Sequence, residues 1–158
     1  MARKAVVIPV IASLFVLGFA VGAAFAPYHT APTPPPGGAG SSGLSAAKAQ
    51  AKTAAAHAGF AAEGGTVSYA KEHLGHALVC IEGPRGANVN AAWENPCGGM
   101  GNGVLPDLQR ANADAALIAK AKDADAAAVA AMKGTNLAEI KASAKQVSTL
   151  MQQIAEAR

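Results

Sequence analysis

Apolar residues recur every three or four positions along much of the chain after residue 45, which is the spacing of one face of an α-helix. In the segment 67–81, which Thr66 can cap, this face comprises Val67, Ala70, Leu74, Ala77, Leu78 and Ile81. A second stripe comprises Leu137, Ile140, Ala144, Val147, Leu150, Met151 and Ile154. The two stripes predict helices over 67–81 and 137–154, the second opened by Asn136 and Glu139 at capping-box spacing.

Two further helices are predicted from residues that favour helix ends. Ser45 can cap a helix that ends at the glycine pair before Thr66, and Pro106 can open a long helix to about Met132. The segment 82–104 is rich in glycine, proline and asparagine, and we expect a long loop there. No alternating run predicts a strand. The domain 45–158 is therefore expected to be all-α, an antiparallel four-helix bundle with one long loop.

The first 44 residues have a different character. Residues 5–26 carry no charge and follow Arg3 and Lys4, so segment 1–26 is predicted to be an N-terminal transmembrane helix that serves as a signal anchor. The alternative is a signal peptide, cleaved after Ala23 or Ala24. Residues 27–44, rich in proline, glycine and serine, are expected to form a flexible tether. The protein is then placed on the periplasmic side of the inner membrane, anchored by its N-terminus or secreted after cleavage.

Composition narrows the function classes. The chain is 51% hydrophobic but only 4% aromatic, so alanine makes up much of the apolar content and large core side chains are few. The net charge is +3, and no basic patch is interleaved with aromatic residues, which argues against nucleic-acid binding. The acidic residues of the third predicted helix are expected to be solvated, in part paired with Lys120 and Lys122; they are Asp107, Asp114, Asp123 and Asp125.

The chain has two cysteines, Cys80 and Cys97. In an exported protein two cysteines most often pair, and a bond here would close a loop of about 18 residues and contribute roughly 3 kcal/mol. The disulfide would hold the loop 82–104 on the second helix with Trp93 beneath it. It would also remove Cys80 as a metal ligand.

Three histidines form a candidate metal site. His73 and His76 lie one turn apart beside the apolar face of the second helix, and His57 lies on the preceding helix. If alanines let the two helices approach to about 8 Å, the imidazoles can meet and bind copper, nickel or zinc. The alternative is that these histidines are boundary residues whose ring nitrogens bond to water or backbone. No activated nucleophile or acid–base pair is evident, so we expect no enzyme.

The stretches "HAGFAAEGG" and "HLGHALVCIEG" resemble the small metal-binding proteins of the bacterial periplasm, which are alanine-rich helical bundles. The resemblance implies binding of divalent metal without catalysis, and His57, His73 and His76 are the residues onto which it carries over. The long loop and the cysteine pair depart from that family.

The leading hypothesis is thus a non-enzymatic, membrane-tethered periplasmic bundle that binds a divalent or copper ion through histidines. The alternative is a structural or assembly subunit of a membrane protein complex. In that case the anchor helix and the loop 82–104 make the contacts, with Arg85, Asn88, Asn90 and Trp93 as contact residues.

Overall fold

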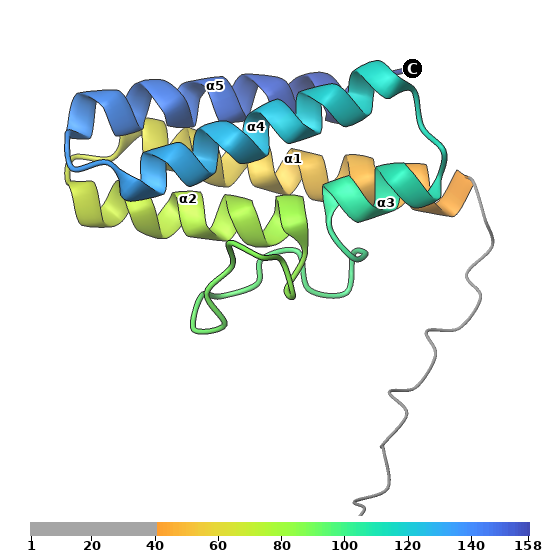
Figure 1. Cartoon of the computed structure of the whole chain (residues 1–158), viewed down its shortest axis with the longest axis horizontal. Helices are drawn as coiled ribbons and strands as arrows, with labels where there is room; N and C mark the ends of the chain where they lie inside the picture. The colour runs from red at the N-terminus through yellow and green to blue at the C-terminus, as the bar shows by residue number, and fades with distance from the viewer. Residues whose placement is uncertain (1–40) are drawn as a thin grey trace, which may run out of the picture. The chain divides into compact units, whose positions relative to one another are not determined.

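The computed structural model describes residues 41–158, which form five helices and no strand (Figure 1). The helices are α1 (Ser41–Glu63), α2 (Val67–Glu82), α3 (Val104–Arg110), α4 (Ala115–Lys133) and α5 (Leu137–Ala155). The predicted all-α class is confirmed. None of these helices is long and apolar enough to cross a membrane. The predicted anchor 1–26, and the tether as far as residue 40, lie outside the described residues.

Two predicted helix caps are present. The side chain of Thr66 accepts a hydrogen bond from the backbone N–H of Tyr69, and Asn136 accepts bonds from Ala138 and Glu139. These side chains satisfy backbone donors that have no partner within a helix. The first helix begins at Ser41, so Ser45 lies within it and is not its cap. The added turn carries Leu44, which packs against the core.

The prediction of one continuous helix from Pro106 to Met132 is wrong. The chain leaves the helix after Arg110, Asn112 adopts a φ of 48°, and the Asp114 side chain accepts a bond from Ala116 N to begin α4. Asparagine and aspartate tolerate this backbone conformation and bond well to nearby backbone groups, so they favour helix ends over helix interiors. The apolar periodicity continues across the break and does not reveal it.

The core is built from alanine on one side and from large side chains on the other. The buried apolar residues of α1 are all alanine: Ala47, Ala51, Ala54, Ala55, Ala58 and Ala61. Leu74, Leu78 and Ile81 from α2, together with Ile140 and Met151 from α5, fill the space that remains. Small side chains let helix axes approach closely. The backbone of α1 can therefore come close to both neighbours.

Hydrogen bonds between α1 and α5 show how close these helices are. Ser148 Oγ donates to the Ala55 carbonyl at 2.9 Å, and Lys48 Nζ donates to the Ala157 carbonyl at 2.6 Å. Ala55 comes after Lys48 in the chain, whereas its partner Ser148 comes before Ala157. The two helices therefore run in opposite directions. A side chain of α5 thus reaches the main chain of α1.

The loop between α2 and α3 is fastened at three places. The Cys80–Cys97 disulfide is present, as predicted, with a Cα–Cα distance of 5.4 Å. Trp93 packs on α2 over Gly75, where a Cβ atom would lie 2.9 Å from the indole ring. The third place is a buried polar cluster at the end of the loop, around Gln50 and Asp107. These attachments make the loop part of the packed structure.

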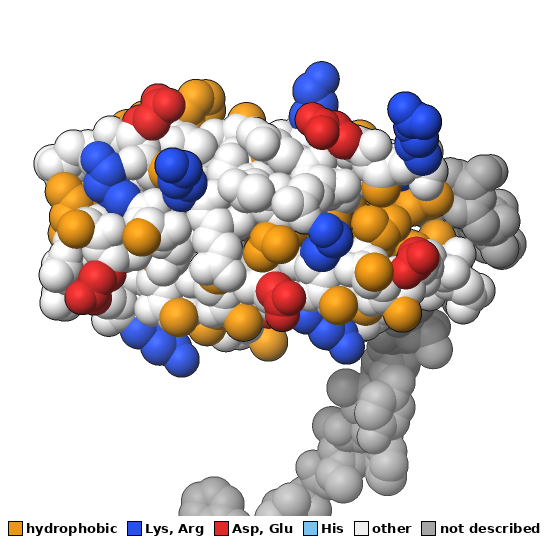
Figure 2. All heavy atoms as spheres, turned by 90° about the horizontal axis from the view of Figure 1, so that it is seen from above, with side chains coloured by type: hydrophobic (Ala, Val, Ile, Leu, Met, Phe, Trp, Pro, Cys, Tyr) orange, Lys and Arg blue, Asp and Glu red, His pale blue; other side chains and the backbone are white. Residues whose placement is uncertain are grey.

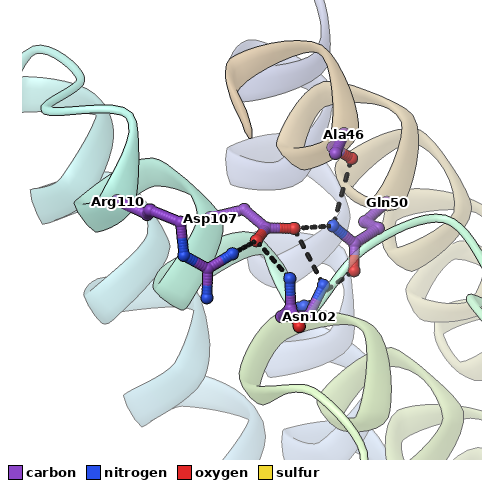
Figure 3. Close-up of polar contacts among 6 residues, drawn as sticks. Ala46, Gln50, Asn102, Asp107 and Arg110 are labelled. Carbon is purple, nitrogen blue, oxygen red and sulfur yellow. Dashed lines mark hydrogen bonds and ion pairs between the residues drawn. The ribbon is translucent and has the colours of Figure 1, made fainter. Parts of the chain in front are cut away.

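Asp107 is the centre of that polar cluster (Figure 3). The prediction that it is solvated is wrong, because it is 1% exposed. Its Oδ2 accepts bonds from Gln50 Nε2 at 2.8 Å and from Asn102 N at 2.9 Å. Its Oδ1 accepts from Asn102 Nδ2 and Arg110 Nη1, both at 3.0 Å. Gln50 Oε1 in turn accepts from Gly103 N at 2.8 Å. These bonds offset the cost of burying the carboxylate and tie α1, α3 and the loop together.

Charged side chains elsewhere are mixed in sign. Figure 2 shows the face seen from above in Figure 1, where basic and acidic side chains are interspersed and no histidine is visible. The expected pairing of aspartates with Lys120 and Lys122 is not found. Lys120 donates to Gln153 Oε1, and the ion pair present within residues 41–158 is Arg110–Asp107.

Gly101 is the position that tests the polar cluster. A Cβ atom there would lie 2.2 Å from Asp107 Oδ2 and 2.4 Å from Gln50 Nε2, so Gly101→Ala must separate two buried partners. We expect the free energy of unfolding to fall by about 1–3 kcal/mol, measured by urea denaturation. Gly65→Ala is the matched control, because nothing lies within 4 Å of its Cβ position. Equal stability of the two variants would contradict this role of the cluster.

Asp125 in α4 is a second acidic residue that is not freely solvated. It is half-buried, and its Oδ1 has no hydrogen-bond donor in the described part of the chain. Burial raises the pKa of Asp125 to about 7, and a shared hydrogen bond and charge repulsion with the Glu82 carboxyl act in the same direction.

The raised pKa of Asp125 predicts a loss of stability as pH increases. Between about pH 4, near the pKa of an aspartate in the unfolded chain, and pH 7, the folded protein retains a proton that the unfolded chain has released. Unfolding therefore becomes easier as pH rises through this window. Asp125→Asn should flatten the slope and raise Tm more at pH 8 than at pH 4, measured by calorimetry. The exposed Asp123→Asn is the control and should leave the slope unchanged.

Candidate metal centre

His57, His73 and His76 converge at the seam between α1 and α2. One ring nitrogen from each residue lies within 4.8 Å of the others. His57 Nδ1 is 3.2 Å from His73 Nδ1, and the His76 ring centroid lies 5.1 Å and 5.5 Å from the rings of His57 and His73. The structure thus brings together the three residues that the sequence proposes as ligands. We refer to them as the histidine triad.

The local fold explains this convergence. His73 and His76 are three residues apart on α2, so both project from the same side of that helix. The turn at Gly64 and Gly65 folds α2 back along α1, and a Cβ atom at Gly64 would lie 2.7 Å from the Tyr69 ring. His57 is adjacent to Ala58, which is fully buried. A tight turn and an alanine-lined face therefore set the distance that lets the rings meet.

The nitrogen distances are compatible with a metal ion. Two nitrogens that each lie ~2.05 Å from a tetrahedral zinc ion are ~3.3 Å apart. The 3.2 Å between His57 Nδ1 and His73 Nδ1 is close to this value. The other nitrogen separations in the triad are within 4.8 Å, so the third ring must move closer to bind the same ion.

His76 has an unused ring nitrogen. The residue is 7% exposed, and its Nδ1 is buried without a hydrogen-bond partner among the described residues. Buried polar atoms nearly always have a partner, so an orphan atom of this kind needs an explanation. The His76 ring lies beside two other imidazoles, so a metal ion held between the three rings could use a nitrogen of His76 as a ligand.

Electrostatics favour the neutral form of His57. Burial lowers its pKa, and the positive charges that His76 and His73 would carry lower it further, while Glu94 opposes the shift. A neutral imidazole has the lone pair that a metal needs, whereas an imidazolium does not. The triad is therefore suited to bind an ion at neutral pH.

The surroundings of the triad differ on its two sides along the seam between α1 and α2. Toward the helix turn there is an open cavity of about 220 Å³, lined by Phe60, Glu63, Gly64, Gly65 and Tyr69, which we call the aromatic pocket. The Tyr69 and Phe60 rings lie 4.4 Å and 5.4 Å from the His73 ring. Both aromatic side chains are unusually exposed, at 43% and 46%.

At the other end, the loop covers the seam. Thr53 Oγ1 donates to Met100 Sδ at 3.7 Å, and Cys97 Sγ lies 3.7 Å from the Gln50 carbonyl. Because both cysteines are in the disulfide, neither offers a thiolate to the triad, as the sequence predicts. No other histidine, cysteine or acidic residue of residues 41–158 joins the cluster.

The predicted contact residues of the loop have mixed environments. Arg85, Asn88 and Asn90 are exposed, whereas Trp93 is half-buried on α2. The backbone and side-chain N–H groups of Asn88 donate to Glu82 at 2.9 Å and 2.8 Å, and Asn90 Oδ1 accepts from Ala92 N. The two asparagines therefore stabilise the loop itself. Arg85 alone of the four is exposed with no side-chain bond within the described residues.

Phe60 is the neighbour of the triad that the sequence reading missed. It follows His57 by three residues on α1, and residues three or four positions apart lie on the same side of a helix. The same rule could have found it. By contrast, nothing in the sequence indicates that His76 would have an unsatisfied nitrogen.

Comparison of the chain with protein-family models, curated proteins and solved structures finds no match. The functional argument therefore rests on the geometry of the triad and its surroundings.

Removal of the disulfide tests the loop that borders the triad. Cys80→Ala combined with Cys97→Ala releases a loop closed across 17 positions, and the free energy of unfolding should fall by about 3 kcal/mol. Because Trp93 is the only tryptophan, its fluorescence should shift to the red as it leaves Gly75. A reducing agent should lower the Tm of the native chain and leave that of the variant unchanged. An unaltered emission spectrum in the variant would show that the disulfide does not hold the loop.

Proposed function

We propose that this protein binds one transition-metal ion through His57, His73 and His76, and that it binds without catalysing a reaction. The observation that carries the proposal is the convergence of three ring nitrogens, one from each histidine, within 4.8 Å. One of these histidines, His76, is buried and has a ring nitrogen without a partner among the described residues. The alternative, boundary histidines bonded to water or backbone, requires a water as the partner of that buried nitrogen, because no backbone group among the described residues bonds to it.

The donor set favours zinc, copper(II) or nickel. Imidazole suits all three ions, whereas copper(I) prefers thiolate or thioether sulfur. Both cysteines are in the disulfide, and Met100 is bonded to Thr53. Protons compete with the metal ion for the ring nitrogens, so the affinity for metal should fall below about pH 6.5, the ordinary pKa of histidine. Because the pKa of His57 is lowered, protonation of His57 should weaken metal binding only at a lower pH.

We further propose that the four long helices form an antiparallel four-helix bundle on a membrane tether in the periplasm. The bundle interpretation is supported by the opposed α1 and α5 and by the short connections at 64–66 and 134–136. The disulfide suits an oxidising compartment. The uncharged stretch 5–26 is the reason for the anchor, and the resemblance to small periplasmic metal-binding proteins agrees with it.

The second candidate is an assembly subunit that contacts a membrane complex through the loop. The observation in its favour is that the disulfide and Trp93 hold an exposed loop on a rigid helix, with Arg85 exposed and its side chain unbonded among residues 41–158. Loops placed on rigid scaffolds often carry recognition. Co-purification with a membrane complex that is lost in Arg85→Ala would favour this candidate.

Calorimetric titration of zinc, copper(II) and nickel into the metal-free, full-length chain tests the leading proposal. We expect one ion to bind per chain, and we expect His57→Ala, His73→Ala and His76→Ala each to weaken binding by at least about 100-fold. Loss of a direct ligand should exceed the 10–100-fold effect typical of residues that only support a ligand. The chain has four histidines, and His29→Ala is the matched control, with no change expected. Binding that is equally strong in all four variants would refute the triad as the metal site.

A further inference from the structure

We infer that a metal ion in the histidine triad keeps one coordination position for a ligand from outside the chain, and that this ligand is a neutral imidazole-type heterocycle held in the aromatic pocket. The inference rests on the proposed metal binding and specifies what the loaded centre recognises. Three observations support it: the number of protein ligands, the side on which the seam is open, and the chemistry of the pocket.

The first observation is that the described chain provides three ligands and no fourth. Zinc bound by protein is almost always four-coordinate, and sites with three protein ligands keep the fourth position for water or another molecule. Only the histidine triad forms a cluster of this kind within residues 41–158. An ion bound there therefore has a position that an external donor can take.

The second observation concerns access. Cys80 lies one turn beyond His76 on α2, and Thr53 lies one turn before His57 on α1; both are held against the loop, at Cys97 and Met100. On the opposite side, Phe60 and Tyr69 lie about one turn from the triad and border an open cavity. The ring of His76 is buried, whereas those of His57 and His73 are partly exposed. An external ligand can thus reach the ion from the side of the aromatic pocket.

The third observation is the lining of the pocket. Its volume of about 220 Å³ is below the 300–1,000 Å³ typical of sites for drug-sized molecules, so it suits a single small ring. The rings of Phe60 and Tyr69 provide apolar walls against which another ring can pack edge-to-face. Glu63 adds one carboxylate to this lining.

These charges select the class of ligand. The bound ion would repel a cation, and Glu63 would weaken the attraction of the ion for a carboxylate or phosphate that approached through the pocket. A neutral imidazole satisfies both groups: one nitrogen binds the metal, and the other donates its N–H to Glu63. Metal-bound imidazoles in proteins commonly donate their second N–H to a carboxylate in this way. The same chemistry is available from a free heterocycle or from a histidine side chain on a partner.

The test is a spectroscopic titration of the cobalt(II)-loaded, full-length chain, because the visible absorption of cobalt reports a change of ligand directly. Imidazole should change the spectrum at a concentration at least about tenfold lower than acetate does. 1-Methylimidazole, which has no N–H to donate, should bind more weakly than imidazole. Phe60→Ala and Tyr69→Ala should each weaken imidazole binding, and both residues are exposed enough for the fold to tolerate the change.

Glu63→Ala, which leaves no side-chain acceptor, should remove the preference for imidazole over 1-methylimidazole, while the exposed Glu72→Ala should retain it as the matched control. Equal affinity for imidazole in all of these variants would overturn the assignment of the pocket, even where the triad still binds cobalt. Failure of the native chain to bind zinc, copper(II), nickel or cobalt would instead refute the metal centre itself.

Two further ligands separate the sources of the imidazole. An acetylated histidine amide represents a small free ligand, and a ten-residue peptide with a central histidine represents a partner side chain. Tighter binding of the peptide, lost in Tyr69→Ala, would identify a protein partner. Binding of the small amide alone would identify a free heterocycle. Absence of a spectral change with either would contradict the inference.

Discussion

The close approach of α1 to its neighbours is the constraint on which the rest of the structure depends. All buried apolar residues of this helix are alanines, so its backbone comes near enough to α5 for Ser148 to bond to the Ala55 carbonyl. The same small alanine side chains allow the His57 ring to approach the His73 ring across the seam with α2. A larger residue at Ala54 or Ala58 would separate these helices and the imidazoles with them. The alanine content is therefore a geometric requirement of the site.

The loop between α2 and α3 follows from the same packing. It crosses the seam of α1 and α2, where the disulfide attaches it to α2 and the buried Asp107 cluster attaches it to α1. Because a buried carboxylate must be fully bonded, this cluster holds the loop in one conformation. As a result the seam is covered near Cys80 and open near Phe60. The proposed metal centre acquires its accessible side from this asymmetry.

Much of the fold could be predicted from local patterns. Apolar spacing gave the helices around His73 and Ile140, and capping residues located the starts of α2 and α5. The break at Asn112 was missed because the apolar pattern continues through it, and only the backbone conformation shows where the helix ends. Asp107 was misjudged for a related reason. Its burial depends on Gln50, which is 57 positions away in the chain.

The sequence by itself determined the helical class, the cysteine pair and the identity of the three candidate ligands. These depend on residue type and short-range spacing, which the chain carries before it folds. Only the tertiary structure decided that the imidazoles lie within 4.8 Å, that one nitrogen of His76 is left without a partner, and that Phe60 and Tyr69 border an open pocket. Such features depend on distances between helices, and packing sets those distances.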